Sequence, residues 1–341
     1  NTEVEDVTFR KNKRDVNNNN NFDYLPGVGQ DLDGVDLNRN FDFNWSFGDT
    51  LWVPGASCNS GYHDDFDYYR GPLPGSESEV QSIMNFANNK NFLLSIAYHS
   101  SRSGCVDRYV IYPWAWKDKW GEPIREYSPG FELIEKLGME IAEIAGTDIG
   151  QNYLHTGSSY RKGNAHDWLY RETGCIQYLV EVGYTPNYEY GEGLLVEEDH
   201  LDEVIESNID AFFHLLMRAG GQNEINSIGE SIDGNQIAGI VFDATSGLPI
   251  PNAHMKIQEL EQSNILKPRK TDSQGYYCRL LYPNETYNLI VSANGYQSDT
   301  LFLEDISTMG PTIKDIALTP SLVHDLAFNF SYPDNENEDI Q

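Results

Sequence analysis

The sequence predicts an α/β fold joined to a small all-β sandwich. Over the first 225 residues, apolar runs of strand length alternate with amphipathic segments of helical length. This alternation is typical of a mixed, mostly parallel sheet flanked by helices. From residue 236 onward the pattern changes to short strands separated by Gly, Pro and Asn turns, which is typical of a small sandwich. We therefore expect domains at 1–225 and 236–320, a linker at 226–235 and an acidic tail at 321–341.

Composition excludes several classes of protein. The 341 residues include 23 Lys and Arg against 53 Asp and Glu, a formal net charge of −30. Such a surface repels phosphate backbones and anionic lipid, so we expect no nucleic-acid partner. No apolar run approaches the length of a membrane span. The acidity, and a start at Asn1 without an apolar leader, favour a secreted or extracytoplasmic protein whose preceding segment has been removed or left out.

The four cysteines carry a limited signal. They are widely spaced and form no Cys-x-x-Cys pair, which argues against a zinc ribbon or a thiol redox site. Four cysteines allow three disulfide connectivities, and the sequence does not choose among them.

Each expected element follows from a local pattern. In the first domain we expect strands at 92–98, 109–114 and 176–182, and helices at 77–88, 131–145 and 199–217. Ser76 and Glu79 have the spacing of a capping box for the first of these helices. In the second domain we expect strands at 237–243, 253–259, 276–281, 287–293 and 313–318. The Asn run at 17–21 is interpreted as a surface loop.

Two groups of residues point to chemistry. Asn38 and Arg39 follow a strand-like segment, and this pair is either an exposed ion-pairing turn or a site that holds a carboxylate through the planar guanidinium. His99 and Glu181 each come at the end of an apolar strand, where functional groups of such sheets collect. A carboxylate at the end of a buried strand is costly unless it has a partner or a role.

The order of these segments resembles the zinc metallocarboxypeptidases of the M14 family. The matching segments are Arg-Lys (10–11), Gly-Val-Asp-Leu-Asn-Arg-Asn-Phe (34–41), Ser-Glu-x-Glu (76–79), His-Ser before a Tyr-Pro strand (99–113), Asp-Trp (167–168) and the strand-end Glu181. The second domain resembles the transthyretin-like module of the N/E branch of that family, through segments 237–241, 251–253, 271–281 and 294–296. Together the two resemblances cover nearly the whole chain.

The resemblance implies a catalytic centre. His99 would be a zinc ligand through an imidazole nitrogen. Glu181 would be the general base that activates the zinc-bound water and then protonates the leaving amine. Arg10 would stabilise the oxyanion that develops on the scissile carbonyl.

The resemblance also implies a substrate-binding site. Asn38 and Arg39 would hold the terminal carboxylate of a peptide or protein substrate, and Tyr160 would cover the bound substrate. His166 falls at the position of a specificity-pocket residue. Asp36 would orient a ligand histidine from behind. The branch tends to favour basic C-terminal residues, which gives a weak expectation for Lys or Arg.

One departure from the family pattern concerns the metal. The family takes two zinc ligands from a His-x-x-Glu motif upstream of the Arg-Lys segment, and no histidine precedes Arg10 here. We therefore expect that the front of the catalytic domain lies outside this chain, and that ligands outside it complete the site for one Zn²⁺. The expected partner is therefore either a companion fragment that carries the missing segment or another copy of this chain.

His200 and Glu203 form a His-x-x-Glu on an expected surface helix, which we interpret as a chance match. Asp64, Asp65 and Asp67 are interpreted as a solvated acidic loop.

Two functions follow from these patterns. The first is a secreted zinc carboxypeptidase that removes one C-terminal residue. The alternative is a catalytically inactive homologue that binds peptides or acts in assembly, with the β-domain as its docking surface.

Overall fold

The computed structural model describes most of the chain. The described residues are 11–23, 33–47, 69–99, 108–117, 123–124, 126–147, 153–159, 162–182, 198–221, 236–262, 265–282, 285–304, 306 and 310–321.

A four-stranded mixed sheet forms the centre of the first part of the chain. Its strands are β1 (Leu94–His99), β6 (Ile176–Glu181), β2 (Tyr109–Tyr112) and β5 (Leu154–Gly157), in that spatial order. Strand β1 runs parallel to β6 and β2 parallel to β5, whereas β2 and β6 are antiparallel. The prediction of a mixed sheet is confirmed.

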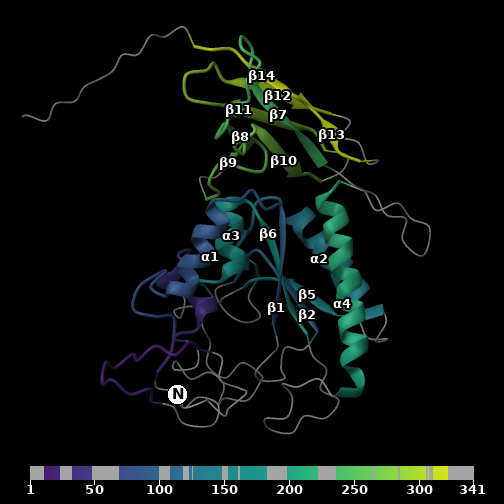
Figure 1. The fold of residues 1–341 in the computed structure, drawn as a ribbon. Helices are drawn as coiled ribbons and strands as arrows, with labels where there is room; N and C mark the ends of the chain where they lie inside the picture. The colour runs from purple at the N-terminus through teal and green to yellow at the C-terminus, as the bar shows by residue number, and fades with distance from the viewer. Residues whose placement is uncertain are drawn as a thin grey trace, which may run out of the picture.

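Helices cover both faces of this sheet. Figure 1 shows α1 (Ser78–Asn88) and α3 (Ala165–Thr173) on one side, and α2 (Phe131–Thr147) and α4 (Glu198–Ala219) on the other. The core between the layers is apolar and aromatic, and Trp114, Trp168 and Tyr178 are almost completely buried in it. Burial of large rings of this kind dominates the stabilisation of a core.

Several boundaries differ from the sequence prediction. The first strand begins at Leu94 and ends at His99, and the second ends at Tyr112, directly before Pro113. Proline has no N–H to donate to a ladder, which accounts for that end. The sequence did not predict the helix α3 or the strand β5. It also did not predict the two-residue strands β3 (Ala115–Trp116) and β4 (Glu126–Tyr127), or the 3₁₀ turns η1 (Leu37–Arg39) and η2 (Trp45–Phe47).

The predicted capping box at α1 is wrong. Glu77 is the N-cap residue and makes no side-chain capping bond. The Ser76 hydroxyl instead donates to the Glu77 carboxylate at 2.7 Å, and Glu77 also accepts from Asn12 and Arg14. Glu77 is thus used to attach the segment at 11–14 to the start of the helix.

The second part of the chain is a β-sandwich of two four-stranded sheets. One sheet contains β10 (Tyr276–Leu280), β7 (Gln236–Asp243), β13 (Thr312–Ile313) and β14 (Ile316–Leu318). The other contains β12 (Asp299–Leu303), β11 (Tyr287–Ser292), β8 (His254–Ile257) and β9 (Arg269–Lys270). Strands β9 and β12 were not predicted, and the expected strand at 313–318 is divided into β13 and β14. The predicted all-β sandwich is confirmed, with its own apolar core.

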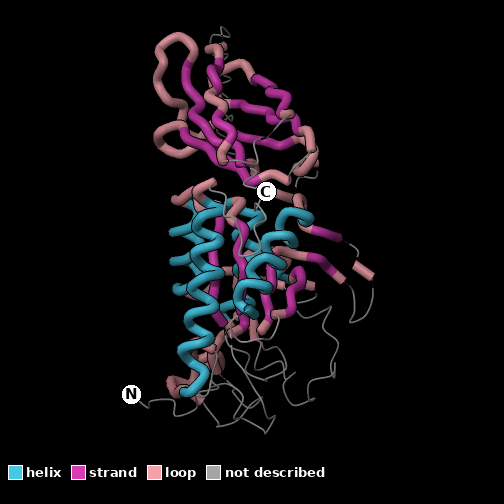
Figure 2. The backbone as a smooth tube through the Cα atoms, turned by 90° about the vertical axis from the view of Figure 1, so that its right-hand side faces the viewer, coloured by secondary structure: helices cyan, strands magenta, loops and turns pink. Residues whose placement is uncertain are grey.

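The sandwich packs against one end of the mixed sheet, as Figures 1 and 2 show. Arg269 of β9 donates to the Tyr170 carbonyl oxygen near the end of α3. The side-chain amide of Asn91, which lies just before β1, donates to the Lys270 carbonyl oxygen of β9. The amino-terminal ends of β1 and β6 therefore face the sandwich. Their carboxyl ends lie at the opposite edge.

Two further features were tested in the described residues. Cys175 and Cys278 are free thiols, so the connectivity that pairs them with each other does not occur. Within the described ranges, no helix has the length and apolar character needed to span a membrane.

Candidate active site

His99 and Glu181 lie side by side at the carboxyl ends of two strands. They are register partners in the parallel pair of β1 and β6, and the Val182 amide donates to the His99 carbonyl oxygen at 2.8 Å. Register partners in neighbouring strands project to the same face of a sheet. The imidazole and the carboxylate therefore leave the sheet edge together, both partly buried.

Asn38 and Arg39 lie on the short turn η1. Asp36 caps this turn, because its carboxylate accepts from the Asn38 amide at 3.1 Å. Asp36 is 2% exposed, and one of its oxygens lies 3.9 Å from Arg39 Nε. These two contacts join Asp36 to the residues that would hold a substrate carboxylate.

A second segment fixes the orientation of this turn. Arg39 donates to the Asn164 side-chain oxygen at 2.7 Å, and the Ala165 amide donates to the Asn38 side-chain oxygen at 2.9 Å. Because the Asn38 oxygen is occupied, its NH₂ group remains as the donor for a ligand. Gly163 allows the close approach: its φ is +72°, and a Cβ there would lie 2.3 Å from the Arg39 carbonyl oxygen.

His166 connects the two groups of residues electrostatically. It is 2% exposed, and burial lowers the pKa of its imidazole to about 3, with further lowering from Arg39 and then His99. The imidazole is therefore neutral at physiological pH. Both Arg39 and His99 therefore lie close enough to this buried imidazole to lower its pKa.

A buried ionisable pair beside His166, formed by Lys162 and Asp167, was not predicted from the sequence. Burial lowers the pKa of the Lys162 amine, and burial raises the pKa of the Asp167 carboxyl, each against the attraction of the other. Lys162 Nζ lies 3.9 Å from the centre of the Trp116 ring, and Asp167 accepts from the Ser158 hydroxyl at 3.1 Å. A lysine two residues after Tyr160 gave no signal of burial in the sequence. Asn164 was also missed, because its partner Arg39 is distant in the chain.

The remaining predicted residues are only partly visible. Arg10, Tyr160, Asp64, Asp65 and Asp67 lie outside the described residues. His200 and Glu203 lie on the helix α4.

The described residues fit one part of a zinc site. His99 supplies an imidazole donor of the kind that zinc prefers, next to the Glu181 carboxylate. In the part of the chain that the structure describes, no group of three His, Cys, Asp or Glu side chains is arranged to hold a metal ion. Other residues must complete a metal site at this edge.

Comparisons with known proteins show the family of each part of the chain. Residues 2–211 match the family model for zinc carboxypeptidase, peptidase M14, and residues 236–323 match the carboxypeptidase regulatory-like domain. Among curated proteins, the chain is 26% identical to mouse carboxypeptidase A6 over 165 residues, which cover 46% of this chain and 32% of the relative. It is 29% identical to human carboxypeptidase B over 175 residues, covering 51% and 37%. The match to mouse carboxypeptidase D is 28% over 274 residues, covering 74% and 17%.

Two solved structures match part of this chain. Carboxypeptidase A from Helicoverpa armigera is 18% identical, with a TM-score of 0.41, over 58% of this chain and 45% of that one. Bovine thrombin-activatable fibrinolysis inhibitor is 20% identical, with a TM-score of 0.41, over 55% and 57%.

The chain is a member of a class of hydrolases with a mixed sheet flanked by helices. It belongs to the zinc carboxypeptidase family, M14, and carries a carboxypeptidase regulatory-like domain after the α/β part. The chain spans about a third of the length of the curated carboxypeptidases A6 and B that it matches.

Proposed function

We propose that this chain forms part of a zinc-dependent carboxypeptidase that hydrolyses the C-terminal peptide bond of peptides or proteins. One observation carries the proposal: His99 and Glu181 are register partners at one sheet edge. The lowering of the His166 pKa by both Arg39 and His99 supports an Arg39 turn close to that edge. A metal ligand, a general base and a carboxylate-binding cation at one edge are the groups that this reaction requires.

Each side chain of the site has a separate role in the proposed reaction. Arg39 and Asn38 bind the terminal carboxylate and so restrict cleavage to the last peptide bond. Glu181 accepts a proton from the attacking water and delivers it to the leaving amine. Arg10 stabilises the negative charge on the carbonyl oxygen. Tyr160 covers the substrate, and His166 contributes to the pocket for the terminal side chain.

Zinc supplies a Lewis acid that polarises the scissile carbonyl. His99 provides one ligand, and the remaining ligands come from outside this chain. Asp36 supports the site from behind, through the Asn38 amide and the Arg39 side chain.

The free edge of the mixed sheet supports an additional segment as the source of those ligands. Among the described strands, β1 pairs only with β6. Tyr98 on this strand is 49% exposed, and its hydroxyl donates to the Asn208 carbonyl oxygen of α4. Helix α4 also exposes large apolar side chains, at Leu201, Ile205, Ile209, Phe212, Phe213 and Leu216. An unpaired edge beside an exposed apolar helix face is a site for a further strand and its packing partner.

Hydrogen exchange tests this companion segment. Amide protection at Leu94–His99 is expected to rise when the 341-residue chain is joined to a segment with a His-x-x-Glu motif. Unchanged protection contradicts the companion segment, and a protected edge in a dimer of the chain alone indicates self-assembly instead.

Metal and turnover measurements test the enzymatic function. The protein that includes the companion segment is expected to bind one zinc ion and to cleave peptides that end in Lys, with Phe and Glu peptides as comparison. Glu181→Gln is expected to lower kcat by about 10²- to 10⁴-fold while zinc stays bound. If this protein binds no zinc and cuts none of the peptides, the enzymatic function is wrong.

The alternative is a catalytically inactive homologue that binds peptides or acts in assembly. The described residues favour it in one respect, because His99 is the one expected zinc-ligand imidazole among them and they contain no group of three side chains arranged to hold a metal ion. In that case peptides with a free C-terminus bind through Arg39 without turnover, and Glu181→Gln changes nothing.

We also propose domain boundaries at 1–225 and 236–320 with a linker at 226–235, an acidic tail at 321–341, and an extracytoplasmic location.

A further inference from the structure

A second cavity lies between the α/β part and the β-sandwich, at the end of the sheet away from His99 and Glu181. Its volume is about 770 Å³, and residues of both parts of the chain line it. The lining includes Leu93, which directly precedes β1, and Ile176, the first residue of β6. The six residues of β1 place His99 about 17 Å from that end of the strand.

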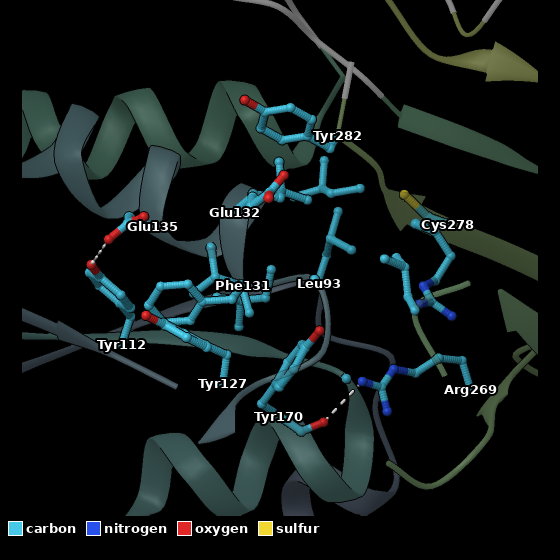
Figure 3. Close-up of a pocket in the computed structure, with 18 of the residues that line it drawn as sticks. Leu93, Tyr112, Tyr127, Phe131, Glu132, Glu135, Tyr170, Arg269, Cys278 and Tyr282 are labelled. Carbon is cyan, nitrogen blue, oxygen red and sulfur yellow. Dashed lines mark hydrogen bonds between the residues drawn. The ribbon is translucent and has the colours of Figure 1, made fainter. Parts of the chain in front are cut away.

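Aromatic rings form one side of the cavity. Phe131 lies 4.6 Å from Tyr127 and 5.8 Å from Tyr112, measured between ring centres, and Tyr127 is 51% exposed. Figure 3 shows these three rings close together, with Tyr282 of the sandwich above Glu132. Exposed rings that face a cavity present their negative π-faces to a ligand.

Carboxylates surround these rings. Glu132 and Glu135 lie on α2, and Glu285 approaches from the sandwich. Glu135 accepts from the Tyr112 hydroxyl at 3.5 Å, and no described Lys or Arg forms an ion pair with any of these three carboxylates. Burial raises the pKa of the Tyr287 hydroxyl to about 12, against its bond to the Tyr282 carbonyl, and Glu285, Glu132 and Glu259 raise it further. The potential at this end of the cavity is therefore negative.

The basic side chains of the lining do not neutralise this end. Arg279 pairs with Glu261 at 2.7 Å, and Lys270 is the neighbour of Arg269 on the two-residue strand β9. Arg269 is 8% exposed, donates to the carbonyl oxygens of Tyr170 and Lys267, and lies over the Tyr170 ring. Figure 3 shows Arg269 at the other end of the cavity, beside Tyr170 and across from Tyr112 and Glu135.

We propose that this cavity binds a guanidinium- or ammonium-bearing segment of a basic peptide, whose alkyl chain and cation pack on the Tyr127 and Phe131 rings between Glu132, Glu135 and Glu285. Rings supply dispersion and cation–π attraction, and carboxylates supply ionic hydrogen bonds that favour guanidinium geometry. Because both parts of the chain contribute, a bound peptide also holds the sandwich against the α/β part.

A peptide blocked at both ends tests this site separately from the active site. Such a peptide has no terminal carboxylate for Arg39, so its binding does not depend on the proposed function. The probe is an acetylated and amidated peptide with two Arg residues, and the comparison peptide has citrulline, the neutral isostere, at both positions. Calorimetric titration of the 341-residue chain is expected to give roughly tenfold tighter binding of the Arg peptide.

Matched variants distinguish a built site from general attraction to a chain of net charge −30. Glu132→Gln and Glu135→Gln are each expected to weaken binding about three- to tenfold, and Tyr127→Ala, which leaves the charge unchanged, by a similar factor. Glu206→Gln on the exposed face of α4 is the control and is expected to leave the affinity unchanged. Equal binding of the citrulline peptide, or equal weakening by Glu206→Gln, overturns the proposal.

Discussion

His99 and Glu181 are register partners at the carboxyl ends of two adjacent parallel strands, although α2, α3 and several strands separate them in sequence. A parallel ladder fixes the relative height of its two strands, so the imidazole and the carboxylate cannot shift independently along the sheet. The rigid strands, rather than loops, hold these two groups together.

Replacement of Gly163 is expected to disturb the Arg39 turn. Alanine at a positive φ costs about 1–2 kcal/mol at any site. At Gly163 the new Cβ would also meet the Arg39 carbonyl oxygen at 2.3 Å, so Gly163→Ala should lower the free energy of unfolding by about 2 kcal/mol more. Gly247→Ala is a matched control, because its φ is +71° and nothing lies within 4 Å of the added Cβ. Urea unfolding measures both, and equal losses would show that the close approach at Gly163 carries no energy.

His166 is expected to make stability depend on pH. Burial lowers the pKa of its imidazole from 6.5 to about 3, so the unfolded chain binds a proton that the folded chain does not. The corresponding stability is fully present above pH 6.5 and is lost as the pH falls toward 3, at up to about 1.4 kcal/mol per pH unit. The free energy of unfolding of the wild type should therefore fall between pH 7.5 and pH 5, and His166→Gln should make that fall smaller by about 2 kcal/mol. His254→Gln, at an exposed position on β8, serves as control, and an unchanged pH dependence in His166→Gln would contradict the expectation.

Arg39 is expected to set the preference for a free C-terminus. Lysine preserves the charge but lacks the planar fork that binds a carboxylate through two hydrogen bonds. In the Glu181→Gln background, Arg39→Lys should reduce the affinity for a free-acid peptide about tenfold, with little change for the amidated peptide. Asn164→Ala removes the acceptor that orients Arg39 at 2.7 Å and should act in the same direction. Arg14→Lys, at the pair with Glu77, is the control, and fluorescence titration gives the affinities.

Arg269 is expected to hold the β-sandwich in place. Its guanidinium donates to the Tyr170 and Lys267 carbonyl oxygens at 3.0 Å from a buried position, so Arg269→Leu leaves both acceptors without this donor. We expect a loss of about 2–4 kcal/mol in the free energy of unfolding, measured in urea. Lys267→Ala is the control, because it removes an ion pair with Glu172 in which the Lys267 side chain is 54% exposed. This variant should lower the free energy of unfolding by less than about 1 kcal/mol. Similar losses in the two variants would be inconsistent with an anchoring role for Arg269.

Local patterns in the sequence determined the classes of element and several chemical residues. Apolar runs of strand length and helical spacing predicted β1, β6 and the helices α1, α2 and α4, but not α3, because periodicity follows from which face an element buries. The strand-end positions of His99 and Glu181 followed from the same runs. The short strands β3, β4, β9 and β12 were not predicted, since two to five residues carry too little pattern.

Only the tertiary structure decided which of these residues meet. The Arg39–Asn164 bond, the buried Lys162–Asp167 pair and the cavity at Tyr127 each join segments that are distant in the chain or unremarkable alone. The sequence fixes which side chains exist and which faces are apolar, because propensity and periodicity are local. Burial, strand register and the approach of one segment to another depend on packing of the whole chain, and these set the pKa of His166 and the pairing of His99 with Glu181.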